Sequence, residues 1–410
     1  MQTLAKFSSP YNMIPPSIRS LKKTDNVQIH DLTLEADAEE MAGVTISEDY
    51  KIAVAKALSQ IGVDRLSILG NSPMPSEGEI TSAKKLISLD LAVRLDAFVK
   101  TIEEIDLAKR IGLWGVEILV GVNDQLLTSE NGRHHILEHC KSLTGYAKEL
   151  DLHTCLFGGD ATRTSEDFLE EIVTTLEGHY DEFTIADSAG VISPYGLQYL
   201  TERVGTWTKK PLKVHLHNHT SMATANALAA VVGGVETIQT TVNGVGELTG
   251  LVPLEEFAVA SEIHLGISTG LKLSGLHELS RLVARATGLP TNVNKPVVGN
   301  GAFAIPETEE IQQYFWELHQ DGKLEEAFCY PPRLVGNTFK MSIGARCNTF
   351  TILYNLSKKG LTTDDETVSN IADTVQAELS DKYGYNLWTA DELFDFCLER
   401  GFPIKPIDNS

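Results

Sequence analysis

The sequence predicts an α/β protein: a (β/α)8 TIM barrel followed by a mostly helical C-terminal region. Between Val27 and about Leu265, eight short apolar segments alternate with segments of helical periodicity. The interior apolar segments are continuous, as expected for parallel strands covered on both faces. Eight such units fit a closed barrel. The competing doubly wound sheet normally has a glycine-rich turn after its first strand, whereas acidic residues follow Asp31–Leu34 here.

The expected strands and helices follow from these segments. The candidate strands are Val27–Asp31, Arg65–Gly70, Ala92–Phe98, Val116–Val122, His153–Phe157, Glu182–Ala186, Leu212–His217 and Thr237–Val242. The candidate barrel helices include Glu48–Ile61, Arg133–Leu150, Ser165–Glu177, Pro194–Val204, Met222–Val232 and Pro253–Ile263. Ser47 stands before the first of these helices as an expected N-cap.

Three regions are expected: an N-terminal arm at 1–22, the barrel at 23–268, and C-terminal helical subdomains at 269–410. The last region contains the helical segments Leu271–Thr287, Glu309–Leu318, Thr349–Lys359 and Asp365–Lys382. We expect this region to lack an enclosed core of its own and to pack on a neighbouring barrel.

Composition excludes several classes of protein. The chain has 34 Lys and Arg against 56 Asp and Glu, a net charge of −22, which disfavours nucleic acid as a partner. Its five cysteines have no paired spacing, which favours a reducing compartment. Neither a signal peptide nor an apolar run of membrane-spanning length is expected. We therefore expect a cytoplasmic protein that does not bind membranes.

The sharpest chemical signal is His215-Leu216-His217. Residues i and i+2 of a strand point to the same side, so both imidazoles face one direction. At the C-terminal end of a barrel strand, such a pair suits a divalent cation. The alternative is two ordinary core or surface histidines.

Two neighbouring segments favour the metal site. After the eighth strand, Asn243 can offer an amide oxygen to a hard cation, and Glu247 can serve as an acid–base group. Asn243-Gly244 is also an ordinary turn pair. The first strand leads into five carboxylates at 31–40, which form either a solvated acidic loop or part of the cation site, with Asp37, Glu35 or Glu39 as the ligand.

These motifs resemble the metal-dependent barrel enzymes that include 2-isopropylmalate synthase, homocitrate synthase and hydroxymethylglutaryl-CoA lyase. The matching segments, in order, are Asp160–Thr164, Ala186–Gly190, His215–Asn218 with Asn226, Thr241–Glu247, and Lys295–Gly299 with Ala302–Ala304. The resemblance implies a divalent metal (Mg²⁺, Mn²⁺ or Zn²⁺) held by Asp37, His215, His217 and Asn243. It also implies acyl-CoA and 2-oxo acid substrates and a homodimer.

The synthase branch is the better match because the chain continues well past the barrel. The resemblance implies that His319 and Tyr330 reach the partner's site and act there with Glu247. The family's first-strand arginine is absent, with Glu35 or Ala36 in its place, and its second-strand glutamate appears as Ser67. Loss of such a donor to a developing oxyanion costs a few kcal/mol of barrier, so Lys100 and Arg163 are candidate replacements. Asp160 and Thr184 complete the expected substrate-binding set.

Three functions remain open at this point. The first is an acyltransferase that condenses an acyl-CoA with a 2-oxo acid, in a divergent variant. The second is a lyase that runs the same site in the cleavage direction. The third is a catalytically inactive homologue, suggested by the missing arginine and disfavoured by retention of a cation shell.

Overall fold

The computed structural model describes the chain except residues 1–8, 10–25, 36–40, 71–74, 130 and 408–410. The predicted N-terminal arm lies outside the described residues apart from Ser9. Two compact units are present, residues 1–291 and residues 292–410, and each is described by itself.

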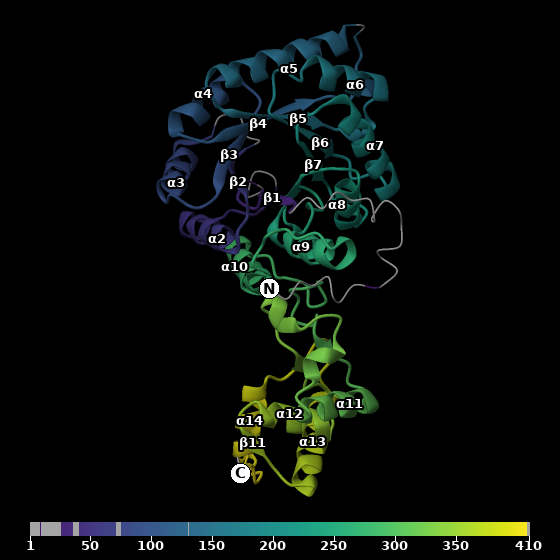
Figure 1. The fold of residues 1–410 in the computed structure, drawn as a ribbon. Coiled ribbons are helices and arrows are strands. Elements are labelled where there is room, and N and C mark those ends of the chain that lie inside the picture. Colours follow the sequence, from purple (N-terminus) through teal and green to yellow (C-terminus); the bar gives the residue numbers. More distant parts are fainter. Residues whose placement is uncertain (1–8, 10–25, 36–40, 71–74, 130, 408–410) are drawn as a thin grey trace. The chain divides into compact units, whose positions relative to one another are not determined.

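The first unit contains the predicted barrel (Figure 1). Eight parallel strands close in chain order, and β1 pairs with both β2 and β8. The strands are β1 (Gln28–Asp31), β2 (Arg65–Leu69), β3 (Arg94–Val99), β4 (Gly115–Gly121), β5 (His153–Gly159), β6 (Glu182–Asp187), β7 (Leu212–Leu216) and β8 (Thr237–Thr240). The predicted fold class is confirmed.

Helices surround the strands. They are α2 (Glu48–Ile61), α3 (Glu77–Ser88), α4 (Ile102–Ile111), α5 (Gly132–Glu149), α6 (Glu166–Thr175), α7 (Pro194–Trp207), α8 (Ala223–Val232), α9 (Leu254–Ala260) and α10 (Leu276–Thr287). Local chemistry sets their ends: the Ser47 side chain accepts a hydrogen bond from the Tyr50 N–H, and Thr101 forms a capping box with Glu104. At the other end of α2, Gly62 takes a left-handed φ of 96°.

The first unit ends later than residue 268, where the sequence analysis placed the boundary. The segment before α10 is tied to the end of α2, since the Lys272 N–H donates to the Ile61 carbonyl at 2.7 Å. Leu276, Leu279 and Val283 of α10 are buried. This helix is therefore part of the barrel unit.

The second unit has a core of its own, which corrects the expectation that it would lack one. It contains α11 (Glu309–Gln320), α12 (Thr349–Ser357), α13 (Asp365–Ser380) and α14 (Ala390–Glu399), with short strand pairs β9 (Ala304–Ile305) with β10 (Lys340–Met341) and β11 (Leu361–Thr362) with β12 (Lys405–Pro406). Apolar residues of α12, α13 and α14, among them Ile352, Ile371 and Leu393, form one buried cluster. No helix among the described residues is both long and apolar enough to cross a membrane.

Candidate active site at the mouth of the barrel

The histidine pair converges as the sequence predicted. His215 is the fourth residue of β7, and His217 follows the strand, so the two side chains lie on the same side. Their Nε2 atoms are 3.2 Å apart. Both residues are nearly buried, with 8% and 6% of their surface exposed. The pair lies at the C-terminal end of β7, which is the active face of barrels of this kind.

Both imidazoles are neutral at pH 7. Burial, with a further contribution from neighbouring His217, lowers the pKa of His215 to about 3. Burial also lowers the pKa of His217, against the opposing effect of the Glu247 carboxylate. A neutral imidazole keeps a lone pair on one nitrogen, which is the form that binds a metal.

An apolar layer packs beside the pair and accounts for the desolvation of His215. Leu32, Phe98, Phe157, Ala186 and Leu251 form one buried cluster, supplied by strands on several sides of the barrel and by the loop after β8. The Phe157 ring meets His215 edge-on, with centroids 5.1 Å apart. An apolar cluster thus lies against one side of the histidine pair.

The geometry of the pair fits a divalent cation. Two nitrogens that each lie about 2.1 Å from a tetrahedral or octahedral ion are roughly 3.0 to 3.4 Å apart, and the observed separation falls in that range. His215 Nδ1 lies 2.9 Å from the Gln239 amide oxygen, so this nitrogen donates and Nε2 carries the lone pair. The Nδ1 atom of His217 has no hydrogen-bond partner among the described residues.

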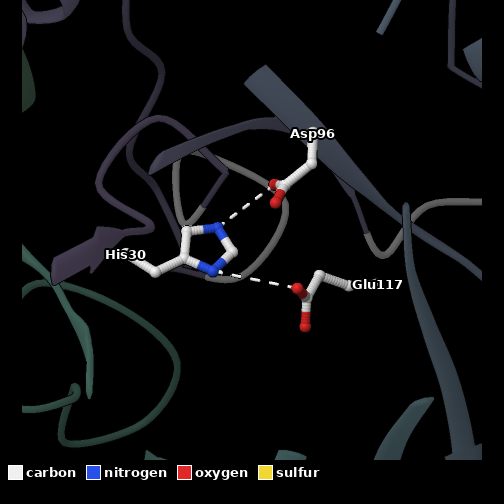
Figure 2. A group of neighbouring side chains, drawn as sticks. All are labelled: His30, Asp96 and Glu117. Atoms are coloured by element: carbon white, nitrogen blue, oxygen red, sulfur yellow. Dashed lines mark hydrogen bonds and ion pairs between the residues drawn. The ribbon is translucent and has the colours of Figure 1, made fainter. Parts of the chain in front are cut away.

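A polar layer lies inside the barrel beneath the mouth. His30, Asp96, Glu117, Lys213 and Gln239 come from five strands, and each has at most 2% of its surface exposed. Figure 2 shows the His30 ring between the carboxylates of Asp96 and Glu117, at 3.1 and 3.8 Å. In this layer, opposite charges and hydrogen bonds offset the cost of burying ionisable groups.

Two groups in this layer have metal-ligand composition, His30–Asp96–Glu117 and Glu117–Cys155–Glu182. The Lys213 ammonium occupies the place that a cation would take. It contacts Glu117 at 2.5 Å, Glu182 at 2.8 Å and His30 Nδ1 at 3.2 Å. Burial raises the pKa of the Cys155 thiol well above its usual value, so that thiol stays protonated. The layer is therefore an internal ion-pair network.

Ser67 and Thr184, which the sequence analysis expected to bind substrate, lie in this polar layer. Neither has any exposed surface. The Ser67 hydroxyl donates to Asp96 at 2.5 Å, and the Thr184 hydroxyl lies 3.1 Å from the Cys155 sulfur.

The side chain of Asn243, an expected metal ligand, is hydrogen-bonded to Ser280 of α10. Its backbone takes a left-handed φ of 63° in the turn after β8. Its amide oxygen accepts a hydrogen bond from the Ser280 hydroxyl at 2.5 Å, and its amide nitrogen donates to the Ser280 carbonyl at 2.9 Å. Asn243 therefore fastens the turn after β8 to α10. Asp37, the other expected ligand, lies outside the described residues.

Glu35 lies beside the end of β2. Its buried side chain packs against Gly70, and a β-carbon at Gly70 would come within 2.6 Å of its Cγ. It lines a small cavity with Lys51, Glu79 and Ser82. The Glu35 side chain, expected where the family has its arginine, therefore lies next to residues of α2 and α3.

The candidate replacements for that arginine are placed differently. Arg163 forms a two-point ion pair with Asp160, through Nε at 2.8 Å and Nη2 at 2.6 Å. Asp160 also accepts from the Asn123 amide at 2.7 Å. Lys100 follows β3 and is exposed to solvent. Arg163 is therefore held by its neighbour, whereas Lys100 extends from the end of its strand.

Glu247 lies in the loop after β8, is exposed, and acts electrostatically on His217. His319 and Tyr330 belong to the second unit. There His319 Nε2 lies 3.2 Å from the Ser357 hydroxyl, and Tyr330 packs edge-on against Phe303 at 5.6 Å. Burial raises the pKa of Tyr330, so the phenol keeps its proton.

Sequence reasoning missed the polar layer and Gln239. A signal was present: His30, Asp96, Glu117 and Lys213 are charged or ionisable residues inside otherwise apolar strands. Each lies at an alternate strand position that faces the barrel interior. Such residues are almost never fully buried unless paired, so their occurrence in several strands predicts a network.

The fold and the histidine pair define a (β/α)8-barrel enzyme with its chemistry at the C-terminal mouth. More particularly, the chain belongs to the HMGL-like family, whose model matches residues 26–283.

Relatives agree with this family. Homocitrate synthase AksA of Methanothermobacter thermautotrophicus is 30% identical over 90% of this chain and 92% of its own length. The (R)-citramalate synthase CimA of Methanocaldococcus jannaschii is 32% identical over 85% of this chain and 70% of its own length. The hydroxymethylglutaryl-CoA lyase of Pseudomonas aeruginosa superposes with a TM-score of 0.57 at 16% identity, covering 65% of this chain and 95% of the lyase, which supports the fold alone. The predicted resemblance is confirmed.

Proposed function

We propose that this protein is a metal-dependent acyltransferase that forms a carbon–carbon bond between an acyl-CoA and a 2-oxo acid. The observation that carries the proposal is the 3.2 Å approach of two neutral imidazole nitrogens at the mouth of an HMGL-like barrel. Two of the relatives described above are named as synthases, homocitrate synthase and (R)-citramalate synthase. A divalent cation bound there would polarise the carbonyl of the acceptor as a Lewis acid.

Different residues of the chain would bind the metal, remove the proton and exclude water. His215 and His217 would hold the cation, with Asp37 as a further protein ligand. Glu247 is the proposed base that takes the proton from the acyl donor, since its exposed carboxylate acts on the same histidine. The apolar layer around Phe157 keeps water from the buried side of the pair.

We also propose a cytoplasmic homodimer in which His319 of a second copy completes the site. His319 is a half-buried imidazole whose pKa burial lowers, so it is neutral and able to accept a proton at pH 7. Tyr330 of that copy would act only as a neutral phenol.

The test uses the purified full chain with Mg²⁺, Mn²⁺ or Zn²⁺, an acyl-CoA such as acetyl-CoA, and a panel of 2-oxo acids. We expect metal-dependent release of free thiol. His215→Ala and His217→Ala should each lower the rate at least about 100-fold, in keeping with the cost of losing a ligand of the polarising ion. His134→Ala, which removes an exposed histidine of α5, is the matched control and should keep full activity.

Absence of thiol release by the wild-type chain across the whole panel would contradict the proposal. Cleavage of a 3-hydroxyacyl-CoA without any condensation would do so as well, in favour of a lyase.

A further inference from the structure

We propose that Gln239 is a positioning residue, which fixes the proton of His215 on Nδ1 and so presents the Nε2 lone pair to the mouth. The inference deepens the proposed function and rests on it only where metal binding is concerned. The hydrogen bonds of Gln239 join the histidine pair to the polar layer beneath it.

Gln239 is the third residue of β8 and has no exposed surface. Its amide oxygen lies 2.9 Å from His215 Nδ1. Its amide nitrogen lies 3.3 Å from His30 Nδ1 and 3.4 Å from Glu117 Oε2. One side chain therefore connects the histidine pair to the ion-pair network.

The network sets the orientation of this amide. Lys213 contacts Glu117 at 2.5 Å, and a carboxylate paired with an ammonium can only accept hydrogen bonds. The same ammonium lies 3.2 Å from His30 Nδ1, so that nitrogen accepts as well. Two acceptors face one end of the Gln239 amide, and that end must be the NH2 group. A flipped amide would place its oxygen against both.

The orientation of the Gln239 amide in turn fixes the tautomer of His215. Because the Gln239 oxygen can only accept, His215 Nδ1 must donate to it. A neutral imidazole with its proton on Nδ1 carries its lone pair on Nε2, the atom that faces His217. Partners of this kind hold a metal-binding histidine in one tautomer, and their loss costs about 10- to 100-fold in metal affinity.

The experiment compares three variants of the full chain. Gln239→Met removes the acceptor at similar size. Gln239→Glu keeps an acceptor at nearly the same shape, because a carboxyl oxygen can still accept from His215 Nδ1, while the two N–H donors of the amide are lost. Thr237→Val is the matched control: it removes a different hydrogen bond of the network, the 3.1 Å contact to Glu182, and does not touch His215.

Two quantities are measured: the His215 tautomer, by ¹⁵N chemical shifts of the metal-free protein labelled at histidine, and the Zn²⁺ affinity, by competition with a chromophoric chelator. We expect the Nδ1–H form in the wild type, in Gln239→Glu and in Thr237→Val. Gln239→Met should lose this preference and bind Zn²⁺ roughly 10- to 100-fold more weakly.

An unchanged tautomer in Gln239→Met would overturn the inference. So would an Nε2–H tautomer in Gln239→Glu, a readout that remains if the methionine variant does not fold. Equal loss of Zn²⁺ affinity in Gln239→Met and Thr237→Val would mean that Gln239 has only a structural role. A wild-type protein with the Nδ1–H tautomer but no Zn²⁺ binding would contradict the proposed function and leave the assignment of the tautomer standing.

Discussion

The polar layer and the mouth layer, which consists of His215, His217 and the apolar cluster beside them, bury ionisable side chains to a similar degree, but these side chains differ in the partners that they have. In the polar layer, Lys213 has oppositely charged or hydrogen-bonding partners on several sides. In the mouth layer, the Phe157 ring packs on His215, and the Nδ1 atom of His217 has no hydrogen-bond partner among the described residues. Complete pairing marks a layer that holds the barrel together. Incomplete pairing between neutral imidazoles marks a layer able to take a ligand.

The largest expected effect comes from breaking the polar layer. Lys213→Met leaves the buried Glu117 carboxylate without its ammonium, whereas Glu182 keeps its ion pair with Arg65. Removing one partner of a buried ion pair typically costs about 3–5 kcal/mol. We expect the free energy of unfolding of the barrel unit, measured by urea denaturation, to fall by an amount in that range.

A second substitution separates the loss of charge pairing from the loss of packing. Adding Glu117→Gln to Lys213→Met removes the carboxylate that lost its ammonium, so the double variant should be more stable than Lys213→Met alone. If both variants lost the same amount, the network would not owe its stability to pairing, and the contrast between the layers would disappear.

Asp31 extends the comparison, since it is as deeply buried as the polar layer but forms no ion pair with a cation among the described residues. Burial raises its pKa from 3.8 to about 7, and neighbouring Glu255 adds to the rise. The native state therefore holds this proton more tightly than the unfolded chain, and the contribution to stability is lost as pH rises from about 4 to about 7. At pH 8 the loss reaches at most roughly 4 kcal/mol.

Asp31→Asn should remove this dependence. Its amide oxygen can still accept from the Thr33 N–H, the 3.0 Å contact of the native carboxyl. We expect the variant to gain stability relative to the wild type between pH 5 and pH 8, by thermal unfolding at each pH. A constant difference across that range would show that Asp31 is ionised in the native state.

The sequence predicted more of the barrel than of the site because the two depend on different information. Strand and helix periodicity is local, so all eight strands and the pair His215–His217 could be placed from the chain alone. The direction of Asn243 depends on a left-handed turn and on Ser280, 37 residues away. Glu35 likewise turns to a cavity formed with α3. A motif gives the order of residues along the chain, whereas only tertiary contacts decide where a side chain points.

The smallest expected effect tests the placement of Asn243 outside the cation shell. Ser280→Ala removes the hydroxyl that donates to the Asn243 amide oxygen, which should cost about 1 kcal/mol. Ser82→Ala is the control, because the Ser82 hydroxyl is buried without a hydrogen-bond partner among the described residues and its loss should be nearly neutral. Zn²⁺ affinity should not change in either variant. A higher affinity in Ser280→Ala alone would mean that the freed amide oxygen can join the histidines, and the mouth layer would then include Asn243.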